Sequence, residues 1–511
     1  MARILWADDE IDLLKPHVMF LESKGHEVTT VQSGNEAVDQ VKEANYEIIF
    51  LDENMPGLTG LETLEFIKAE NPSIPIVMIT KSEEESIMDS AIGGRINDYL
   101  IKPVNPNQIL LSIKKNLEGK RLVNEQTTLN YQQKFREISM DLQDNLDYDG
   151  WVDIYKRLVY WEVLFDNSDQ SMMEVLQMQK NEANQLFSKY ISKNYLDWFS
   201  DGTGPIMSHQ LLKEKVFPQL KKEKLFMIVI DNLRYDQWQV IRPILMERFT
   251  PKEESLYYSI LPTATQYARN SIFAGMLPSE IQKKFPSKWK NEDDEGSKNQ
   301  FEEDFLLSNL SQNGINSKTS YNKITNLNAG KKLVNNFSNL LQNDFNVIVY
   351  NFVDMLSHAR TDMEVIRELA DDESAYRSLT MSWFEHSALN DLFKLIADNN
   401  YNVVITTDHG TIKVNEPSKV VGDRNTNSNL RYKQGRNLNY QEKDVLVVKN
   451  PEDAYLPRMN VSSTYLFAKE AKFFVYPNNY NYYVNYFKNT FQHGGISMEE
   501  MIIPYIFLES K

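Results

Sequence analysis

The sequence predicts an α/β protein in three parts: a small doubly wound domain, a helical connector and a larger α/β domain. Short apolar runs alternate with amphipathic segments over residues 1–119, which is typical of a parallel sheet covered by helices. Residues 120–207 contain almost no Gly or Pro and carry apolar side chains at helical spacing. In residues 208–511, three apolar runs each end in an aspartate, as expected where parallel strands meet a functional edge.

The composition limits the kinds of site that this chain can build. A chain of 511 residues is too long for one hydrophobic core, and its lack of cysteine excludes disulfides and thiol chemistry. Any metal site must therefore use His, Asp, Glu or a hydroxyl. The net charge of −17 argues against broad nucleic-acid binding. Because the chain shows neither a signal-peptide pattern nor an apolar run of about 18 residues, we expect a cytoplasmic protein without membrane contact.

Polar residues follow each predicted strand of the first domain. The strands end near residues 7, 51, 79 and 101, and they bring to one sheet edge the side chains of Asp8, Asp9, Asp52, Thr80 and Lys102. Three clustered carboxylates repel one another unless a cation lies among them, and hard oxygen ligands suit Mg²⁺. A carboxylate beside the metal can attack a phosphoryl group, and a hydroxyl and an ammonium beside it could bind the phosphate.

The motifs ADDE, LDENMPG, ITKS and YLIKP resemble those of response-regulator receiver domains, which have a flavodoxin-like fold. The resemblance implies that Asp52 accepts the phosphoryl group and that Asp8, Asp9 and Asp52 bind magnesium. It further implies that Thr80, Tyr99 and Lys102 form the switch and that the Lys102–Pro103 bond is cis. A flavodoxin-like domain with acids placed by chance is the alternative, and five matched positions in order argue against it.

The connector is predicted to be a small helical bundle. Aromatic and aliphatic residues such as Trp151, Leu158 and Phe187 recur at helical spacing. A DNA-binding helix-turn-helix is the alternative, but this stretch lacks a basic recognition helix. We expect a connector that transmits dimerisation of the receiver domain.

Acids and histidines follow the three apolar runs of the last domain. These runs end at Asp231, at Asp354 with His358 four residues later, and at Asp408-His409, while His493 lies near the C-terminus. Carboxylates with imidazoles favour Zn²⁺, with Mn²⁺ as second choice. Six ligands exceed the need of one tetrahedral ion, so the set suggests two metals, the usual device for displacement at phosphorus. Any single position could instead be a helix cap or a structural histidine, but the ordered set argues against that alternative.

This order of residues resembles the alkaline phosphatase superfamily and, within it, PglZ-type domains. The resemblance rests on Asp231, a hydroxyl four residues before Gly275, Asp354-x-x-x-His358, the motif TTDHG and His493. It implies two zinc sites, one formed by Asp354, His358 and His493 and the other by Asp231, Asp408 and His409. Ser271 would be the nucleophile and a ligand of the second zinc, with Thr263 and Thr265 as weaker alternatives.

A basic segment follows the DHG motif. Lys413–Arg436 carries six basic residues against two acids, and a basic loop beside a metal centre could bind phosphate oxygens. We expect Arg424, Arg431 and Lys433 to contact the substrate. A solvated surface loop is the alternative.

Taken together, the three parts resemble the PorX-type response regulators. That resemblance implies zinc-dependent phosphodiesterase activity on nucleotides, either cyclic or short oligonucleotides, and control of the type IX secretion system. It also implies a sensor histidine kinase partner, a possible sigma factor partner and a homodimer that depends on phosphorylation. The alternatives are a non-enzymatic adaptor and a phosphomonoesterase, because the superfamily uses one kind of metal centre for several substrates.

Overall fold

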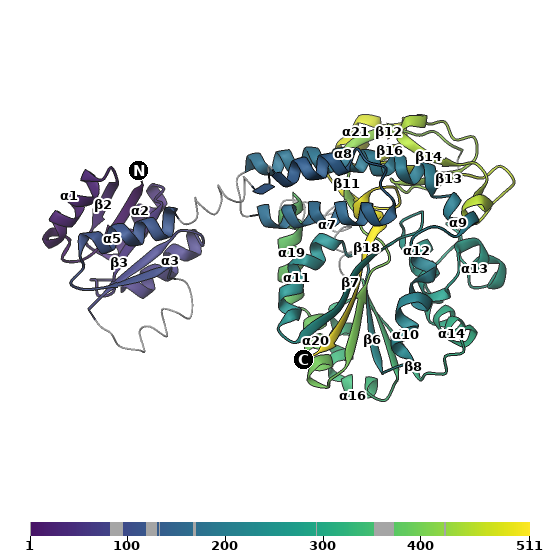
Figure 1. Cartoon of the computed structure of the whole chain (residues 1–511), viewed down its shortest axis with the longest axis horizontal. Helices are drawn as coiled ribbons and strands as arrows, with labels where there is room; N and C mark the ends of the chain where they lie inside the picture. Colours follow the sequence, from purple (N-terminus) through teal and green to yellow (C-terminus); the bar gives the residue numbers. More distant parts are fainter. Residues whose placement is uncertain are drawn as a thin grey trace. The chain divides into compact units, whose positions relative to one another are not determined.

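The structure is a computed structural model that describes residues 2–81, 96–118, 130–131, 133–166, 170–292, 294–351, 372–423 and 426–511. The chain divides into two compact units, Met1–Lys134 and Phe135–Lys511, which Figure 1 shows coloured along the sequence. The connector helices thus pack in the same unit as the C-terminal domain, called the output domain below. Among the described residues, no helix is long and apolar enough to cross a bilayer.

The first unit contains a parallel sheet of five strands in the order β2-β1-β3-β4-β5. This is the strand order of the flavodoxin-like fold, which confirms the predicted fold class. The strands are β1 (Arg3–Ala7), β2 (Glu27–Val31), β3 (Ile48–Asp52), β4 (Ile76–Thr80) and β5 (Asp98–Ile101). The helices are α1 (Lys15–Ser23), α2 (Gly34–Glu43), α3 (Gly60–Glu70) and α5 (Pro106–Ile113).

The connector consists of α7 (Tyr148–Phe165), α8 (Gln170–Asn194) and the short α9 (Asp197–Asp201), preceded by helical residues 133–141. Helix α7 begins after Asp147, whose side chain accepts a hydrogen bond from the Gly150 amide and so satisfies one open donor of the first turn. Trp151 of α7 packs on Phe187 of α8, with 5.4 Å between ring centroids. The predicted helical connector is confirmed.

The output domain is built on a sheet of six strands in the order β7-β18-β10-β6-β9-β8. Strands β10, β6, β9 and β8 are parallel, whereas β18 and β7 run antiparallel at one edge. The strands are β6 (Leu225–Ile230), β7 (Phe249–Tyr258), β8 (Thr319–Ile324), β9 (Phe345–Tyr350), β10 (Asn402–Thr406) and β18 (Ile502–Ser510). The larger helices are α11 (Tyr235–Met246), α12 (Thr265–Ala274), α14 (Glu302–Gln312), α15 (Leu327–Asn335), α19 (Glu373–Glu385) and α20 (Ala388–Asp398), with the shorter α10 (Phe217–Leu220), α13 (Pro278–Lys284) and α16 (Phe337–Leu340).

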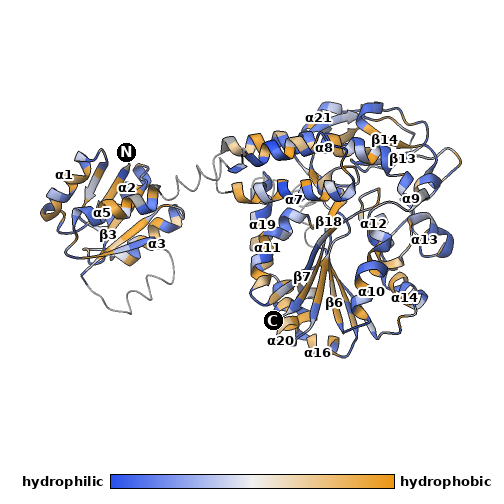
Figure 2. Ribbon diagram, viewed as in Figure 1, coloured by the Kyte–Doolittle hydropathy of each residue, from blue (hydrophilic) through white to orange (hydrophobic). Residues whose placement is uncertain are grey.

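The central strands are buried on both faces because their sequences are continuous apolar runs. Every residue of β6 and of β9 is buried, and Figure 2 shows β6 as hydrophobic along its length. Side chains of β6 such as Phe226 and Ile228 pack with buried residues of α11, α19 and α20 in one core. This packing fixes the carboxyl ends of the strands, where the site lies.

Residues 412–492 form a smaller part that the sequence did not predict in detail. It contains β11 (Ile412–Lys413) paired with β17 (Phe491–Gln492), and β12 (Glu416–Lys419) paired with β16 (Lys472–Val475). A three-stranded sheet joins β13 (Tyr432–Gly435), β15 (Thr464–Ala468) and β14 (Val445–Val448), and α21 (Tyr480–Phe487) follows. The pairing of β11 with β17 brings the chain after His409 next to the chain before His493.

Candidate phosphorylation pocket and metal centre

The first unit gathers the predicted acidic residues at one edge of its sheet. Asp8 follows β1 and Asp52 ends β3, and both are buried, whereas Asp9 is exposed. One carboxylate oxygen from each of Asp8, Asp9 and Asp52 lies within 4.8 Å of the others. Lys102 Nζ, after β5, lies 2.9 Å from Asp8 Oδ2 and 3.0 Å from Asp52 Oδ2. Three carboxylates facing one ammonium suit a divalent cation of the Mg²⁺ kind.

Burial sets the charge balance of this pocket. Burial raises the pKa of the Asp52 carboxyl, and the negative charge of Asp8 raises this pKa further. The hydrogen bond from Lys102 opposes the rise by lowering the same pKa. The Thr80 hydroxyl, at the end of β4, donates to Glu53, and Tyr99 on β5 is 42% exposed. The Lys102–Pro103 peptide is cis, as the receiver resemblance implied.

In the output domain, neighbouring parallel strands bring Asp231, Asp408 and His409 together. Asp231 directly follows β6, and Asp408-His409 lie just beyond β10, which pairs with β6. All three side chains are buried, and their ligand atoms lie within 4.8 Å of one another. Gly410 is required here, because a Cβ atom at this position would lie 2.0 Å from the Glu499 carbonyl oxygen.

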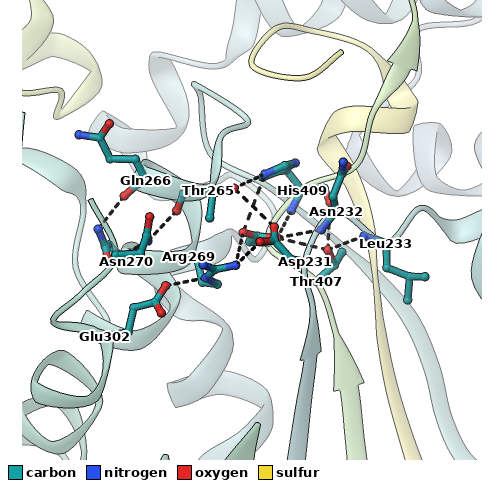
Figure 3. A network of polar contacts seen from close by, with 12 residues as sticks. Asp231, Asn232, Leu233, Thr265, Gln266, Arg269, Asn270, Glu302, Thr407 and His409 are labelled. Atoms are coloured by element: carbon teal, nitrogen blue, oxygen red, sulfur yellow. Dashed lines mark hydrogen bonds and ion pairs between the residues drawn. The ribbon is translucent and has the colours of Figure 1, made fainter. Parts of the chain in front are cut away.

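The hydroxyl that the structure brings to this cluster belongs to Thr265, whereas the sequence analysis expected Ser271 there. Thr265 Oγ1 lies 3.4 Å from Asp231 Oδ1 and 3.0 Å from His409 Nε2, as Figure 3 shows. Thr265 is the first residue of α12 and Ser271 is the seventh, so the two are separated by about 9 Å along the helix axis. The Ser271 hydroxyl is buried and has no hydrogen-bond partner among the described residues.

The third candidate hydroxyl, Thr263, holds the backbone instead. It is buried, donates to the Gly495 carbonyl over 3.0 Å and accepts from the Gly494 amide over 3.0 Å. These bonds join the segment before α12 to the segment after His493.

Arg269 is a functional residue that the sequence analysis missed. Its Nη1 lies 2.6 Å from Asp231 Oδ2 and 3.6 Å from Asp408 Oδ2, and its Nε donates to Glu302 over 2.5 Å. This leaves the other oxygen of Asp231 beside Thr265 (Figure 3). Burial raises the pKa of Asp231 to about 7, a rise that Arg269 limits and Asp408 increases. The sequence signal was present, because Arg269 follows Thr265 by four residues, one helical turn.

Both site histidines are held in a defined tautomer. Nδ1 of His409 lies 3.2 Å from the Gly410 carbonyl, and Nδ1 of His493 lies 3.0 Å from the Thr263 carbonyl. Since a carbonyl only accepts, each Nδ1 donates, and in the neutral ring Nε2 carries the lone pair that a metal needs. The two rings stack at 4.2 Å between centroids. His493 thus lies beside His409, while Asp354 and His358 lie outside the described residues.

The donor set fits zinc. Two carboxylates, an imidazole with Nδ1 occupied and a neighbouring hydroxyl are ligands that Zn²⁺ accepts in proteins, and they converge in a buried position. Asp231, Asp408 and His409 would hold one ion.

The basic segment contributes less to the site than expected. Arg431 is fully buried and pairs with Glu500 at 2.6 Å, so it is not a surface contact for substrate. The Lys433 amine donates to the Asn427 carbonyl over 2.8 Å, and burial lowers the pKa of this amine to about 8. Arg424 lies outside the described residues. The expected positive surface is reduced because Arg431 and Lys433 have partners inside the fold, and a basic residue paired there adds no positive charge to the surface.

Comparison with known families matches three parts of the chain in order. Residues 4–114 match the response regulator receiver domain, residues 121–199 the PorX response regulator linker domain, and residues 211–508 the BREX system PglZ alkaline phosphatase-like domain. The last match covers more than half of the chain, so the chain belongs to the PglZ family.

Individual relatives match the receiver domain. The transcriptional regulatory protein ResD of Bacillus subtilis is 34% identical over 113 residues, which are 22% of this chain and 47% of ResD. PilH of Pseudomonas aeruginosa is 33% identical over 123 residues, which are 23% of this chain and all of PilH. The chain thus spans about half the length of ResD.

Among solved structures, a CheY-like receiver domain protein from Methanospirillum hungatei is 26% identical, with a TM-score of 0.23, and the match covers 24% of this chain and 97% of that one. TrrA of Thermotoga maritima, solved with Mg²⁺ and BeF, is 29% identical, with a TM-score of 0.22, and the match covers 23% of this chain and 100% of that one. With a receiver, a PorX-type linker and a PglZ domain in this order, the chain belongs to the PorX-type response regulators.

Proposed function

We propose that phosphorylation of Asp52 controls a zinc-dependent phosphodiesterase in the output domain. One observation carries the proposal: the Thr265 hydroxyl lies against Asp231 and His409 at the first turn of α12. A hydroxyl among metal-grade ligands at a helix N-terminus is suited to attack a phosphate, since the helix terminus favours the negative charge.

The residues divide the work as follows. The Thr265 hydroxyl gives up its proton to solvent, and its oxygen forms a bond to phosphorus while the bond to one ester oxygen breaks. The departing alkoxide takes a proton from water. A water molecule then attacks the same phosphorus, and the bond between phosphorus and the Thr265 oxygen breaks. A phosphate monoester is released, and the Thr265 oxygen takes up a proton and becomes a hydroxyl again. Arg269 holds Asp231 in place during both displacements through its 2.6 Å contact.

Zinc, held by Asp231, Asp408 and His409, would favour the ionised hydroxyl and balance the charge on the phosphate oxygens. The stacked position of His493 supports a second ion nearby, for which Asp354 and His358 are the proposed further ligands. Nucleotides as substrates and control of type IX secretion rest on the resemblance to PorX-type regulators, as does a sigma factor partner.

Hydrolysis of bis-p-nitrophenyl phosphate tests the activity. We expect turnover with added zinc, its loss after chelation and its return on re-addition of zinc. Mono-p-nitrophenyl phosphate, measured in parallel, separates a diesterase from a monoesterase. Zinc binding without turnover of either ester, or of a short oligonucleotide, would instead favour the non-enzymatic adaptor.

A further inference from the structure

Helix α8 of the connector holds the segment of the output domain that begins at His493. Asn184 Nδ2 donates to Glu499 Oε2 over 2.9 Å, and Asn184 Oδ1 accepts from the Met498 amide over 2.8 Å. Lys180 Nζ lies 3.5 Å from Glu499 Oε1, and Ser188 donates to the Ile496 carbonyl over 3.4 Å. These side chains are buried. A buried polar group that loses its hydrogen-bond partner destabilises the fold, so these contacts restrict where α8 can lie against the segment.

The held segment reaches directly into the candidate site. Its first residue, His493, stacks on His409. Two residues later, the Gly495 amide donates to Glu500 over 2.9 Å, and the Thr263 hydroxyl donates to the Gly495 carbonyl. The chain from His493 to Glu500 therefore forms one hydrogen-bonded piece with α8 on one side and the metal ligands on the other.

A second contact reaches the nucleophile. The hydroxyl of Tyr195, one residue beyond the end of α8, accepts from the Leu261 amide over 2.7 Å. Leu261 lies four residues before Thr265, and both Tyr195 and Leu261 are fully buried. The same helix thus contacts the segments that carry His493 and Thr265.

Ion pairs connect α8 to α7 and, through α7, to the output domain. Lys180 of α8 pairs with Glu162 of α7 at 2.7 Å, and Glu162 also accepts from Arg377 of α19 over 2.8 Å. The two connector helices and the output domain share one buried network of charges.

We propose that α8 is a positioning element of the active site, in which Asn184 sets His493 and Tyr195 sets Thr265. A displacement of α8 would then change metal binding and nucleophile placement together. This inference rests on the proposed function and deepens it, because it names the route by which the connector regulates the site.

The test compares full-length Asn184→Leu with Gln179→Leu. Both variants remove a buried amide from α8, but the Gln179 amide donates to Phe135 and Ser139 of the connector, whereas the Asn184 amide bonds to the segment after His493. Zinc affinity is measured by competition with a chromophoric chelator, kcat and KM with the diester, and folding by thermal unfolding. We expect Asn184→Leu to raise the zinc dissociation constant about tenfold and lower kcat about tenfold at unchanged KM, as outer-sphere substitutions commonly do. Gln179→Leu should leave both within about twofold.

Tyr195→Phe is the second, milder variant, since it removes one hydroxyl only. It should lower kcat several-fold in a protein that unfolds normally, and it decides the question if Asn184→Leu does not fold. Wild-type zinc affinity and kcat in both variants would overturn the inference, as would equal losses in Asn184→Leu and Gln179→Leu. Failure of the proposed function looks different, because the wild-type protein itself would then bind no zinc or hydrolyse no ester.

Discussion

At the scale of single residues, the position along α12 determines which hydroxyl lies beside Asp231 and His409. Thr265 and Ser271 carry equivalent hydroxyls, and both are buried or nearly so in the same ten-residue helix. Only Thr265 lies against Asp231 and His409. The difference comes from position on the helix rather than from residue type.

This difference predicts opposite results for two alanine variants. Thr265→Ala should lower kcat with bis-p-nitrophenyl phosphate by about a thousandfold or more, because it removes the attacking oxygen. Ser271→Ala removes a buried hydroxyl without a described partner and should retain kcat within a few-fold. Loss of activity in Ser271→Ala with retention in Thr265→Ala would restore the assignment made from sequence.

From the sequence we expected Asp231, Asp408 and His409 to lie together, as they do, but we favoured Ser271 over Thr265 as the hydroxyl beside them. Asp231, Asp408 and His409 were recognisable because each follows an apolar strand, and strands of a parallel sheet end at one edge. Choosing between hydroxyls required the start of α12, and helix boundaries are the least certain part of a sequence prediction. The burial of Arg431 could not be predicted from sequence for a related reason: its partner Glu500 is 69 residues away in the chain.

At the scale of elements, the contact between α7 and the output domain is the feature that the sequence concealed. The spacing of apolar residues predicted the helices, and the alternation of strands and helices predicted both sheets. Nothing local showed that Glu162 of α7 and Asp166, directly after α7, face Arg377 of α19, more than 200 residues later. The antiparallel strands β7 and β18 were also not predicted, because an apolar run does not indicate whether a strand runs parallel or antiparallel to its neighbours.

Arg377 should be important for the stability of the second unit. It is fully buried and pairs with Glu162, Asp166 and Asp236. Arg377→Met removes the cation that these three carboxylates share, two of which, Glu162 and Asp236, are buried. We therefore expect a loss of about 3–5 kcal/mol in the free energy of unfolding by urea.

Arg248→Met is the matched control for this substitution. It breaks the ion pair with Asp398, which is largely exposed, and should cost less than about 1 kcal/mol. Equal midpoints for the two variants would show that the buried network does not stabilise the unit.

At the scale of the whole molecule, the chain joins a phosphate-accepting pocket in one unit to a metal-grade cluster in the other. In this pocket Asp52, the proposed phosphate acceptor, lies beside Lys102. The connector helices α7 and α8 belong to the second unit by packing.

We therefore expect Asp52→Asn to prevent labelling by acetyl phosphate and the accompanying dimerisation, because an amide offers no anionic oxygen to phosphorus. Phosphate-affinity gels and light scattering measure the two effects. Asp12→Asn serves as control, since Asp12 is exposed and its described contacts, with Lys15 and Gln32, lie at the surface. Dimers of Asp52→Asn under acetyl phosphate would separate association from phosphorylation.

The docking of α7 and α8 also determines where this protein can be divided and recombined. A cut at residue 207, the boundary suggested by sequence, would separate Arg377 from its partner on α7 and Glu499 from its partner on α8. It would expose charged side chains that are buried in the intact unit. A cut before Phe135 separates the two compact units instead. We therefore expect that a foreign receiver can be joined at Phe135, whereas α7, α8 and the PglZ domain must be kept together as one part.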